Sequence, residues 1–438
     1  MIEFLTLVLG LVTGPHPVAL AVEAPVVAVE LRLDGAAAGH LDAEPWEIEI
    51  DFGDALLPHH LEAVGLDAEG SEVVRVEQWI NLPRPQVEAR LILEPAADAG
   101  SGRVRFHWQS ATVEDLALER ISWRLDGEPL AASGVRLGLP ALAREDLHFV
   151  EAEAVLSDGR TAYAELIFGG RFGDEVASEL TPVRVALAPE AAEPTAAGLA
   201  TCFTAAGSPV PVVAVESDPG ELLLVRDGSV PGLTFRRLPR SNNPTINRRL
   251  RDRRIRALLP LTDGQRVRLV LPHGDVAHRA GNRFDVFPLS PSYEAGEGGL
   301  FHWLMVDPFG DQVAEGEPRL ADATAVAGVR AYGARRPVVV VLVPGSGFAD
   351  DASAYPPAAV AGYLESLGVP LRVWSFDRKA ADAGDWPDAS PAHNIRQLGR
   401  ALAEAEELLA RQRLVWIEGR HLPQQVAVRE GCGVALSR

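Results

Sequence analysis

Oxygen-bearing side chains follow an apolar run near the middle of the chain. The run ELLLVRDGS, at 221–229, ends in Asp227 and Ser229. Carboxylate and hydroxyl oxygens are ligands that hard cations such as Mg²⁺ prefer, and open α/β sheets bind ligands at the carboxyl ends of their strands. Two further carboxylates, Asp350 and Asp351, follow a second apolar run. These four residues are the candidate metal ligands; for Asp227 and Ser229, an ordinary turn at the end of a strand is the alternative.

An arginine-rich segment follows the first of these runs. Residues 235–256 hold nine arginines and a single acid, Asp252, in a chain whose net charge is −20. We expect this segment to bind a protein partner or to contact the acidic N-terminal domains of the same chain; a solvated helix face is the alternative. Nucleic acid is not the expected partner, because only Phe235 offers a ring for base stacking. The candidate contact residues are Arg236, Arg237, Arg248, Arg249, Arg251 and Arg253.

Familiar catalytic spacings are missing from the sequence. It contains no GxxxxGK[ST] loop, no HExxH zinc motif and no GxSxG nucleophile elbow. The loop VPGSGFADD, at 343–351, resembles the oxyanion loop of α/β hydrolases, but no elbow follows it. A hydrolase is therefore the disfavoured alternative, and we expect a protein that is not an enzyme. The adjacent His59 and His60 are expected to be strand-edge or turn residues.

Short alternating runs fill the first 187 residues and predict β structure. Apolar and polar residues alternate over four to ten positions, and Asp-Gly, Glu-Gly and proline punctuate the runs. Leu33-Asp34-Gly35 recurs as Leu125-Asp126-Gly127, and in both places a strand, an acidic turn and another strand follow. This repetition predicts two tandem immunoglobulin-like β-sandwiches, at 1–83 and 84–187. One larger β domain is the alternative.

The pattern changes after a linker at 188–199, which is rich in alanine, proline and glutamate. The continuous apolar run PVVVVLVPG, at 337–345, is typical of a strand buried on both faces. Helical periodicity predicts helices over about 319–332 and 356–367 and a third that begins at Ser390-Pro391. Residues 200–438 therefore predict an α/β domain with a doubly wound, mostly parallel sheet.

Composition limits the compartments and partners of the chain. Arginine supplies all but one of the 41 basic residues, a bias typical of GC-rich bacterial genomes. The two cysteines, Cys202 and Cys432, cannot form a zinc knuckle, and whether they form a bridge stays open at this point. No apolar stretch is long enough for a transmembrane helix. A signal peptide within 1–21 lacks a basic start but ends in the small residues Ala19-Leu20-Ala21, and a periplasmic or extracellular location is favoured over the cytoplasm.

The last 240 residues resemble the bacterial von Willebrand factor A-related proteins. The resemblance covers roughly residues 200–420 and is carried by four segments in the family's order: ELLLVRDGS, LTDGQRVRLVLP, RRPVVVVLVPG and YLESLGVPLRVWSF. In that family Asp-x-Ser-x-Ser after the first strand and Asp-Gly after a later strand bind a divalent cation. Here Pro231 takes the third ligand position and Pro344-Gly345 replaces the Asp-Gly. The resemblance therefore implies an A-type domain whose adhesion site is degenerate.

The resemblance and the residues together predict a binding or scaffolding protein, exported or surface-associated in a bacterium. Its expected ligand is a protein of unknown identity, and no cofactor is expected. A working Mg²⁺-dependent adhesion site, completed by Asp350 or Asp351, is the main alternative.

Overall fold

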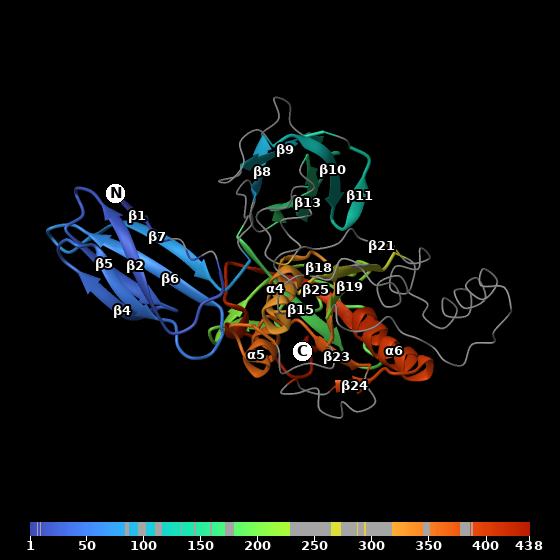
Figure 1. Ribbon diagram of the computed structural model, residues 1–438. Coiled ribbons are helices and arrows are strands. Elements are labelled where there is room, and N and C mark those ends of the chain that lie inside the picture. Colours follow the sequence, from blue (N-terminus) through green and yellow to red (C-terminus); the bar gives the residue numbers. More distant parts are fainter. Residues whose placement is uncertain are drawn as a thin grey trace.

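The computed structural model shows two β-sandwiches and a larger C-terminal part that contains, in its described residues, a parallel sheet and three α-helices (Figure 1). The structure describes residues 1–6, 8, 10–83, 87–94, 102–109, 116–132, 134–143, 146–157, 160–170, 179–227, 264–272, 287, 293–294, 318–344, 351–376, 386 and 389–438. Within these ranges no helix combines the length and the apolar character that a membrane crossing requires.

The first sandwich is built from seven antiparallel strands in two sheets. Apolar side chains that alternate along the strands, such as Val29, Leu31, Leu61 and Ile50, fill the space between the sheets. One sheet has the order β1 (Ile2–Phe4), β2 (Pro15–Val22) and β5 (Glu47–Asp51). The other has the order β4 (Ala36–Leu41), β3 (Ala28–Leu33), β6 (His59–Leu66) and β7 (Glu72–Ile80).

The second sandwich repeats this topology strand for strand. One sheet has the order β12 (Arg136–Gly138), β9 (Arg103–Gln109) and β8 (Glu88–Glu94). The other has the order β11 (Glu128–Leu130), β10 (Leu118–Leu125), β13 (Leu147–Leu156) and β14 (Thr161–Gly169). In each sandwich the first, second and fifth strands form one sheet and the remaining four form the other. The prediction of two tandem immunoglobulin-like sandwiches is confirmed.

The repeated Asp-Gly motif makes the same turn in both sandwiches. Asp34 and Asp126 both have a φ of 53°, and Gly35 and Gly127 both have a φ of 83°. Two consecutive residues with positive φ are required by the tight hairpin turn that matches the twist of its flanking strands. The motif therefore recurs because each sandwich needs this turn between its third and fourth strands.

The aspartate of each turn also holds a histidine on the sixth strand. The ring nitrogen Nδ1 of His59 lies 2.8 Å from Oδ2 of Asp34, and Nδ1 of His148 lies 2.9 Å from Oδ2 of Asp126. In both sandwiches the other carboxylate oxygen accepts the backbone N–H of the residue after the histidine, at 2.8 Å. The second sandwich thus reproduces a side-chain network of the first as well as its strand order.

The C-terminal part begins earlier than its sequence pattern indicates. The hydrogen bonds of β15 (Leu180–Leu187), whose residues the sequence analysis placed in the second sandwich, go to β25 (Gln412–Glu418) and β27 (Val434–Leu436). Strand alternation reveals which face of a strand is buried but not which strand is its partner. One antiparallel sheet has the order β18 (Val212–Glu216), β25 (Gln412–Glu418), β15 (Leu180–Leu187) and β27 (Val434–Leu436). A smaller sheet has the order β17 (Ser208–Val210), β16 (Phe203–Ala205) and β26 (Val426–Val428). The 3₁₀ helix η3 (Pro423–Gln425) directly precedes β26 in the chain.

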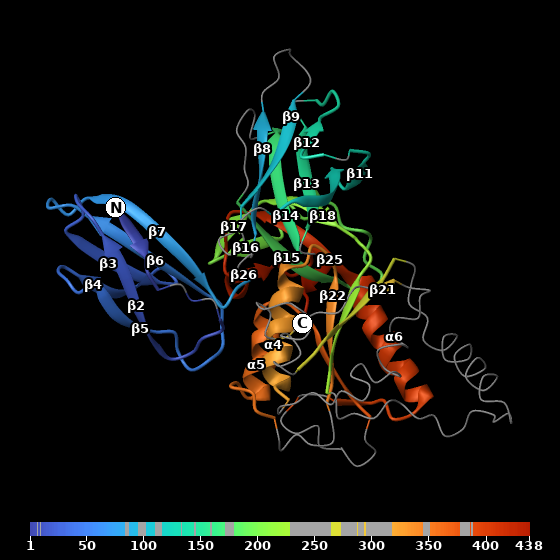
Figure 2. The ribbon, with the colours of Figure 1, turned by 45° about the horizontal axis from the view of Figure 1, so that its top comes forward.

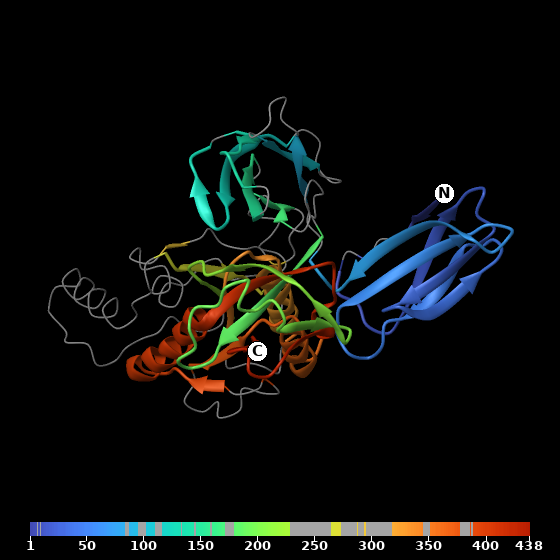
Figure 3. The same cartoon turned by 180° about the vertical axis from the view of Figure 1, so that it is seen from behind.

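The C-terminal part also contains a mostly parallel sheet with helices on both faces (Figure 2). Its order is β21 (Tyr293–Glu294), β20 (Arg266–Val270), β19 (Glu221–Arg226), β22 (Val338–Val343), β23 (Leu371–Ser375) and β24 (Ala389–Pro391), and β21 alone is antiparallel to its neighbour. Helices α4 (Leu320–Gly333) and α5 (Pro357–Ser366) cover one face. Helix α6 (Ile395–Arg411) covers the other and is red in the reverse view (Figure 3). The predicted α/β architecture is therefore present in its coarse form.

The start of α6 corrects one expectation. Ser390 and Pro391, predicted to open this helix, lie in β24 instead. The cap is Asn394, whose side-chain oxygen accepts the backbone N–H groups of Arg396 and Gln397, each at 3.1 Å. Ser390-Pro391 and Asn394 each fit the general preferences for a helix start. Ser390 and Pro391 are part of a strand, however, so the helix begins after Asn394.

A disulfide closes the C-terminal part. Cys202 and Cys432 are bonded, with their Cα atoms 6.0 Å apart across a sequence separation of 230 residues. Both residues pack in the core formed by β15, β16 and β25. The sequence did not decide whether these cysteines form a bridge. In the structure they do, and the bond joins the two ends of this part of the chain.

We predict that opening this bridge destabilises the C-terminal part, because the cross-link restricts the unfolded chain over a long loop. Reduction with dithiothreitol should lower the free energy of unfolding by about 2–5 kcal/mol, measured by thermal or chemical denaturation. The Cys432→Ser variant should show the same loss without reductant and no further change with it. Equal stability of the oxidised and reduced wild-type protein would contradict this prediction.

Candidate functional site

The carboxyl ends of β19 and β22 meet at the point where the strand order of the parallel sheet reverses. The chain passes from β19 to β20 on one side and later returns through α4 to β22 on the other. Open α/β sheets place ligand sites at such switch points. Asp227 follows β19 directly, is only 2% exposed, and donates its backbone N–H to the carbonyl oxygen of Val343 at 3.0 Å. One of the four candidate ligands thus lies at the location that the fold favours for binding.

The second described candidate, Asp351, is engaged at the start of α4. Its carboxylate accepts the backbone N–H groups of Leu320 at 2.9 Å and Ala321 at 3.3 Å, and the hydroxyl of Ser353 at 2.7 Å. A carboxylate in this position satisfies otherwise unpaired helix donors and opposes the positive end of the helix dipole. A role for Asp351 as a metal ligand would compete with these hydrogen bonds.

The remaining sequence-predicted residues lie outside the described residues. These are Ser229, Asp350 and the six arginines Arg236, Arg237, Arg248, Arg249, Arg251 and Arg253. In the part of the chain that the structure describes, no group of three or more histidine, cysteine, aspartate or glutamate side chains is arranged to hold a metal ion.

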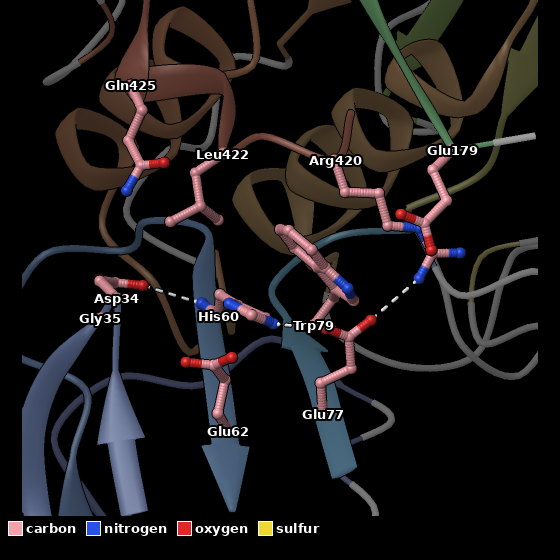
Figure 4. Close-up of a pocket in the computed structure, with 10 residues that line it drawn as sticks. All are labelled: Asp34, Gly35, His60, Glu62, Glu77, Trp79, Glu179, Arg420, Leu422 and Gln425. Carbon is pink, nitrogen blue, oxygen red and sulfur yellow. Dashed lines mark hydrogen bonds and ion pairs between the residues drawn. The ribbon is translucent and has the colours of Figure 1, made fainter. Parts of the chain in front are cut away.

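A cavity that sequence reasoning did not find lies where the first sandwich meets the C-terminal part (Figure 4). Its volume is about 360 Å³, within the range of ligand pockets. Charged side chains predominate in its lining, which consists of Asp34, Gly35, His60, Glu62, Glu77, Trp79, Glu179, Arg420, Leu422 and Gln425.

Glu77 is the centre of the polar contacts in this cavity. Its Oε2 lies 2.9 Å from Nε2 of His60, and its Oε1 accepts a hydrogen bond from Nη1 of Arg420 at 3.1 Å (Figure 4). The imidazole of His60 also stacks on Trp79, with ring centroids 4.3 Å apart and planes 23° apart. Burial acts to raise the pKa of Glu77, but the hydrogen bond and charge of His60, together with smaller contributions from Trp79 and Arg420, outweigh it, and the pKa is lowered. The only sequence signal for this cluster was the His59-His60 pair, because Arg420 is distant in the chain.

The second sandwich meets the C-terminal part through both apolar and charged contacts. Phe149 packs its ring against Trp416 with centroids 5.5 Å apart. The guanidinium of Arg124 makes two hydrogen bonds to Asp218, at 2.7 and 2.6 Å. Arg335, just beyond α4, lies 4.6 Å above the Trp416 ring and pairs with Glu165 of β14 at 3.0 Å. These contacts define the second junction.

Two glutamates, the half-buried Glu151 and the buried Glu216, place carboxyl oxygens inside the second junction. Burial, together with the neighbouring carboxyl of Glu216, raises the pKa of Glu151 from 4.5 to about 10, and burial also raises the pKa of Glu216. Three of their four carboxyl oxygens, Oε2 of Glu151 and both of Glu216, are buried and accept no hydrogen bond from any described residue. Adjacent buried carboxylates cannot both ionise without a large cost, so such a pair holds a proton.

No protein-family model matches the sequence, and no curated protein matches it. Solved structures that resemble the chain include fibronectin(III)-like modules of CbhA from Clostridium thermocellum, with 15% identity, a TM-score of 0.16 and coverage of 39% of this chain and 93% of that one. The central fibronectin-III array of RIM-binding protein is 11% identical, with a TM-score of 0.19 and coverage of 44% and 80%. A β-glucuronidase of glycoside hydrolase family 2 is 10% identical, with a TM-score of 0.19 and coverage of 41% and 21%.

We predict that Glu77 supports the first sandwich in a pH-dependent way. Because the folded-state pKa of Glu77 is lowered, its contribution is present above the unfolded value of about 4.5 and is lost as the pH falls through the folded value. The pair with Arg420 is partly exposed, so Glu77→Gln should cost less than about 1 kcal/mol near pH 7. Denaturant unfolding at about pH 7 and pH 3 would measure both values.

The exposed Glu69, on the same sandwich, provides the matched control. Glu69→Gln should leave stability unchanged at both pH values. A cost of Glu77→Gln that persists unchanged in acid would show that its pairs with His60 and Arg420 are not the source.

Proposed function

We propose that this protein is a non-enzymatic binding and scaffolding protein, in which two immunoglobulin-like sandwiches are held on a von Willebrand factor A-like domain. The observation that carries the proposal is that each sandwich buries side chains against the C-terminal part. Leu56 of the first sandwich, 2% exposed, belongs to the core that α4 and α5 share with the parallel sheet. Phe149 and Ile167 of the second sandwich share a core with Trp416. Apolar interfaces of this kind limit the relative motion that separate domains otherwise have.

Hydrogen bonds reinforce the first of these interfaces. The buried Tyr363 of α5 donates its hydroxyl to the backbone carbonyl of Asn81, and Tyr355 donates to that of Leu11. The side-chain amide of Gln424 donates to the carbonyl of Pro58 at 2.6 Å. Fixed positions for two sandwiches are what a scaffold that presents binding surfaces requires.

The A-type assignment is supported by the central position of β19 and by Asp227 at its carboxyl end, next to β22. In the family that the sequence resembles, these are the strands whose ends carry the metal ligands. Pro231 and Pro344 stand where ligands would be. We therefore propose that a ligand docks at this edge without a firmly held metal. The disulfide supports export, because such bonds persist in oxidising compartments.

The alternative of a Mg²⁺-dependent adhesion site is favoured by the burial of Asp227 at the switch point, and thermal melts of the full chain distinguish the two. Without a firmly held metal, millimolar Mg²⁺ or Mn²⁺ should give the same melting temperature as EDTA. A metal that binds only the folded state would raise it, by about 2–4 °C for each kcal/mol of binding energy.

The Asp227→Asn variant identifies the source of any such rise, and the exposed Asp42→Asn serves as its control. A metal-dependent rise that is present in wild type and in Asp42→Asn but absent in Asp227→Asn would replace our proposal by the adhesion alternative.

The fixed arrangement is itself testable by small-angle X-ray scattering. We expect the wild-type protein at about pH 6 to scatter as one rigid particle. Leu56→Glu should release the first sandwich and raise the radius of gyration, because a carboxylate cannot enter the apolar core around α4 and α5. Val73→Glu, at a 42% exposed position on the same sandwich, should not change the scattering. If the scattering of the wild-type protein instead fits a flexible ensemble of domain positions, the proposed scaffold is wrong.

A further inference from the structure

We propose that Glu151 and Glu216 form a proton-dependent lock that holds the second sandwich to the C-terminal part and releases it as the pH rises. This inference rests on the scaffold arrangement proposed above and adds a regulation to it. Glu151 projects from β13 of the sandwich, and Glu216 ends β18 of the C-terminal part. The two carboxyl groups therefore come from opposite sides of the junction.

The unpaired carboxyl oxygens are the geometric reason for a proton. Oε2 of Glu151 and both oxygens of Glu216 are buried and make no hydrogen bond of good geometry to any described residue, although the Trp416 indole lies close enough to act to lower the pKa of Glu216. Buried acceptors are nearly always paired in folded proteins. A carboxylic acid has an O–H group that a carboxylate lacks. One proton shared by the pair thus supplies a donor and removes one of two adjacent negative charges.

The other charged groups of the junction do not remove the need for this proton. Arg124, on β10, is a cation whose charge acts to lower the pKa of both glutamates, and its guanidinium makes a bidentate pair with Asp218, just after β18. The indole of Trp416, on β25, faces Glu216. Arg335 and Glu165, which also lie in the junction, pair with each other. With every group ionised, the carboxylates of Glu151, Glu216 and Asp218 would face the one guanidinium of Arg124. One shared proton brings this set to a net charge of −1.

The direction of the pH dependence follows from this arrangement. The raised pKa of Glu151 means that the docked state keeps a proton that the separated state releases above about pH 4.5. Docking is therefore fully favoured in acid and weakens as the pH rises toward about 10. For one proton, the docking equilibrium constant falls up to tenfold per pH unit in this window. Release would uncover Phe149 and Trp416, which the closed junction keeps buried.

Scattering of the full-length protein across pH tests the lock. We expect a compact wild-type particle at about pH 5 and a larger radius of gyration at about pH 9. Glu151→Gln and Glu216→Gln each replace a titrating carboxyl by a neutral group of the same shape, so both variants should stay compact at about pH 9. Glu119→Gln, at an exposed position on β10, should open like wild type.

Infrared spectroscopy provides a second readout that does not depend on domain motion. At neutral pH the wild-type protein should show the C=O band of a buried protonated carboxyl group, and Glu151→Gln should lack it. Opening of Glu151→Gln to the same extent as wild type would overturn the lock, as would a wild type that lacks the band and stays compact at about pH 9. A wild-type protein that lacks the band and stays compact would leave the proposed scaffold intact. A wild-type protein that is already flexible at about pH 5 would refute both the scaffold and the lock.

Discussion

The pairing of β15 with β25 is the interaction on which the arrangement of the chain depends. It joins Leu180–Leu187, directly after the second sandwich, to Gln412–Glu418 near the C-terminus. The parallel sheet and its helices lie between these strands in sequence, so the pairing closes them into one structural part, and the Cys202–Cys432 disulfide closes almost the same loop again. Trp416 of β25 is also the residue against which the second sandwich packs. One strand pair thus completes the C-terminal part and carries a docking surface.

The two sandwiches share a topology but are held by different chemistry. The first is anchored mainly by Leu56 in an apolar core and by tyrosine hydroxyls on backbone carbonyls, with the partly exposed pair of Glu77 and Arg420 beside them. The second combines an aromatic contact with a buried set of acids around Arg124. Since the cost of burying charge varies with protonation whereas apolar burial does not, solution conditions act unequally on the two junctions.

The edge of the parallel sheet combines a favoured position with few candidate metal ligands among the residues that the structure describes. Asp227 is buried where the strand order reverses, which is where such sheets bind ligands. Asp351, however, holds the start of α4, and Pro231 has no side-chain oxygen to offer. A hard cation needs several oxygen ligands to replace its water shell. The proposal that a ligand docks at this edge without a firmly held metal rests on this combination.

The sequence by itself determined the local elements and their repetition. Alternation along β6 and β13, the Asp34-Gly35 and Asp126-Gly127 turns and the apolar run of β22 depend on neighbouring residues, so strands, turns and a buried parallel strand were all predictable. The partner of β15, the bridge between Cys202 and Cys432, the cavity at Glu77 and the carboxyl pair of Glu151 and Glu216 were not. Each joins segments far apart in the chain, and residue type records how deeply a side chain is buried but not which distant side chain it meets. Only the tertiary structure decides that, because the meeting depends on how whole sheets pack.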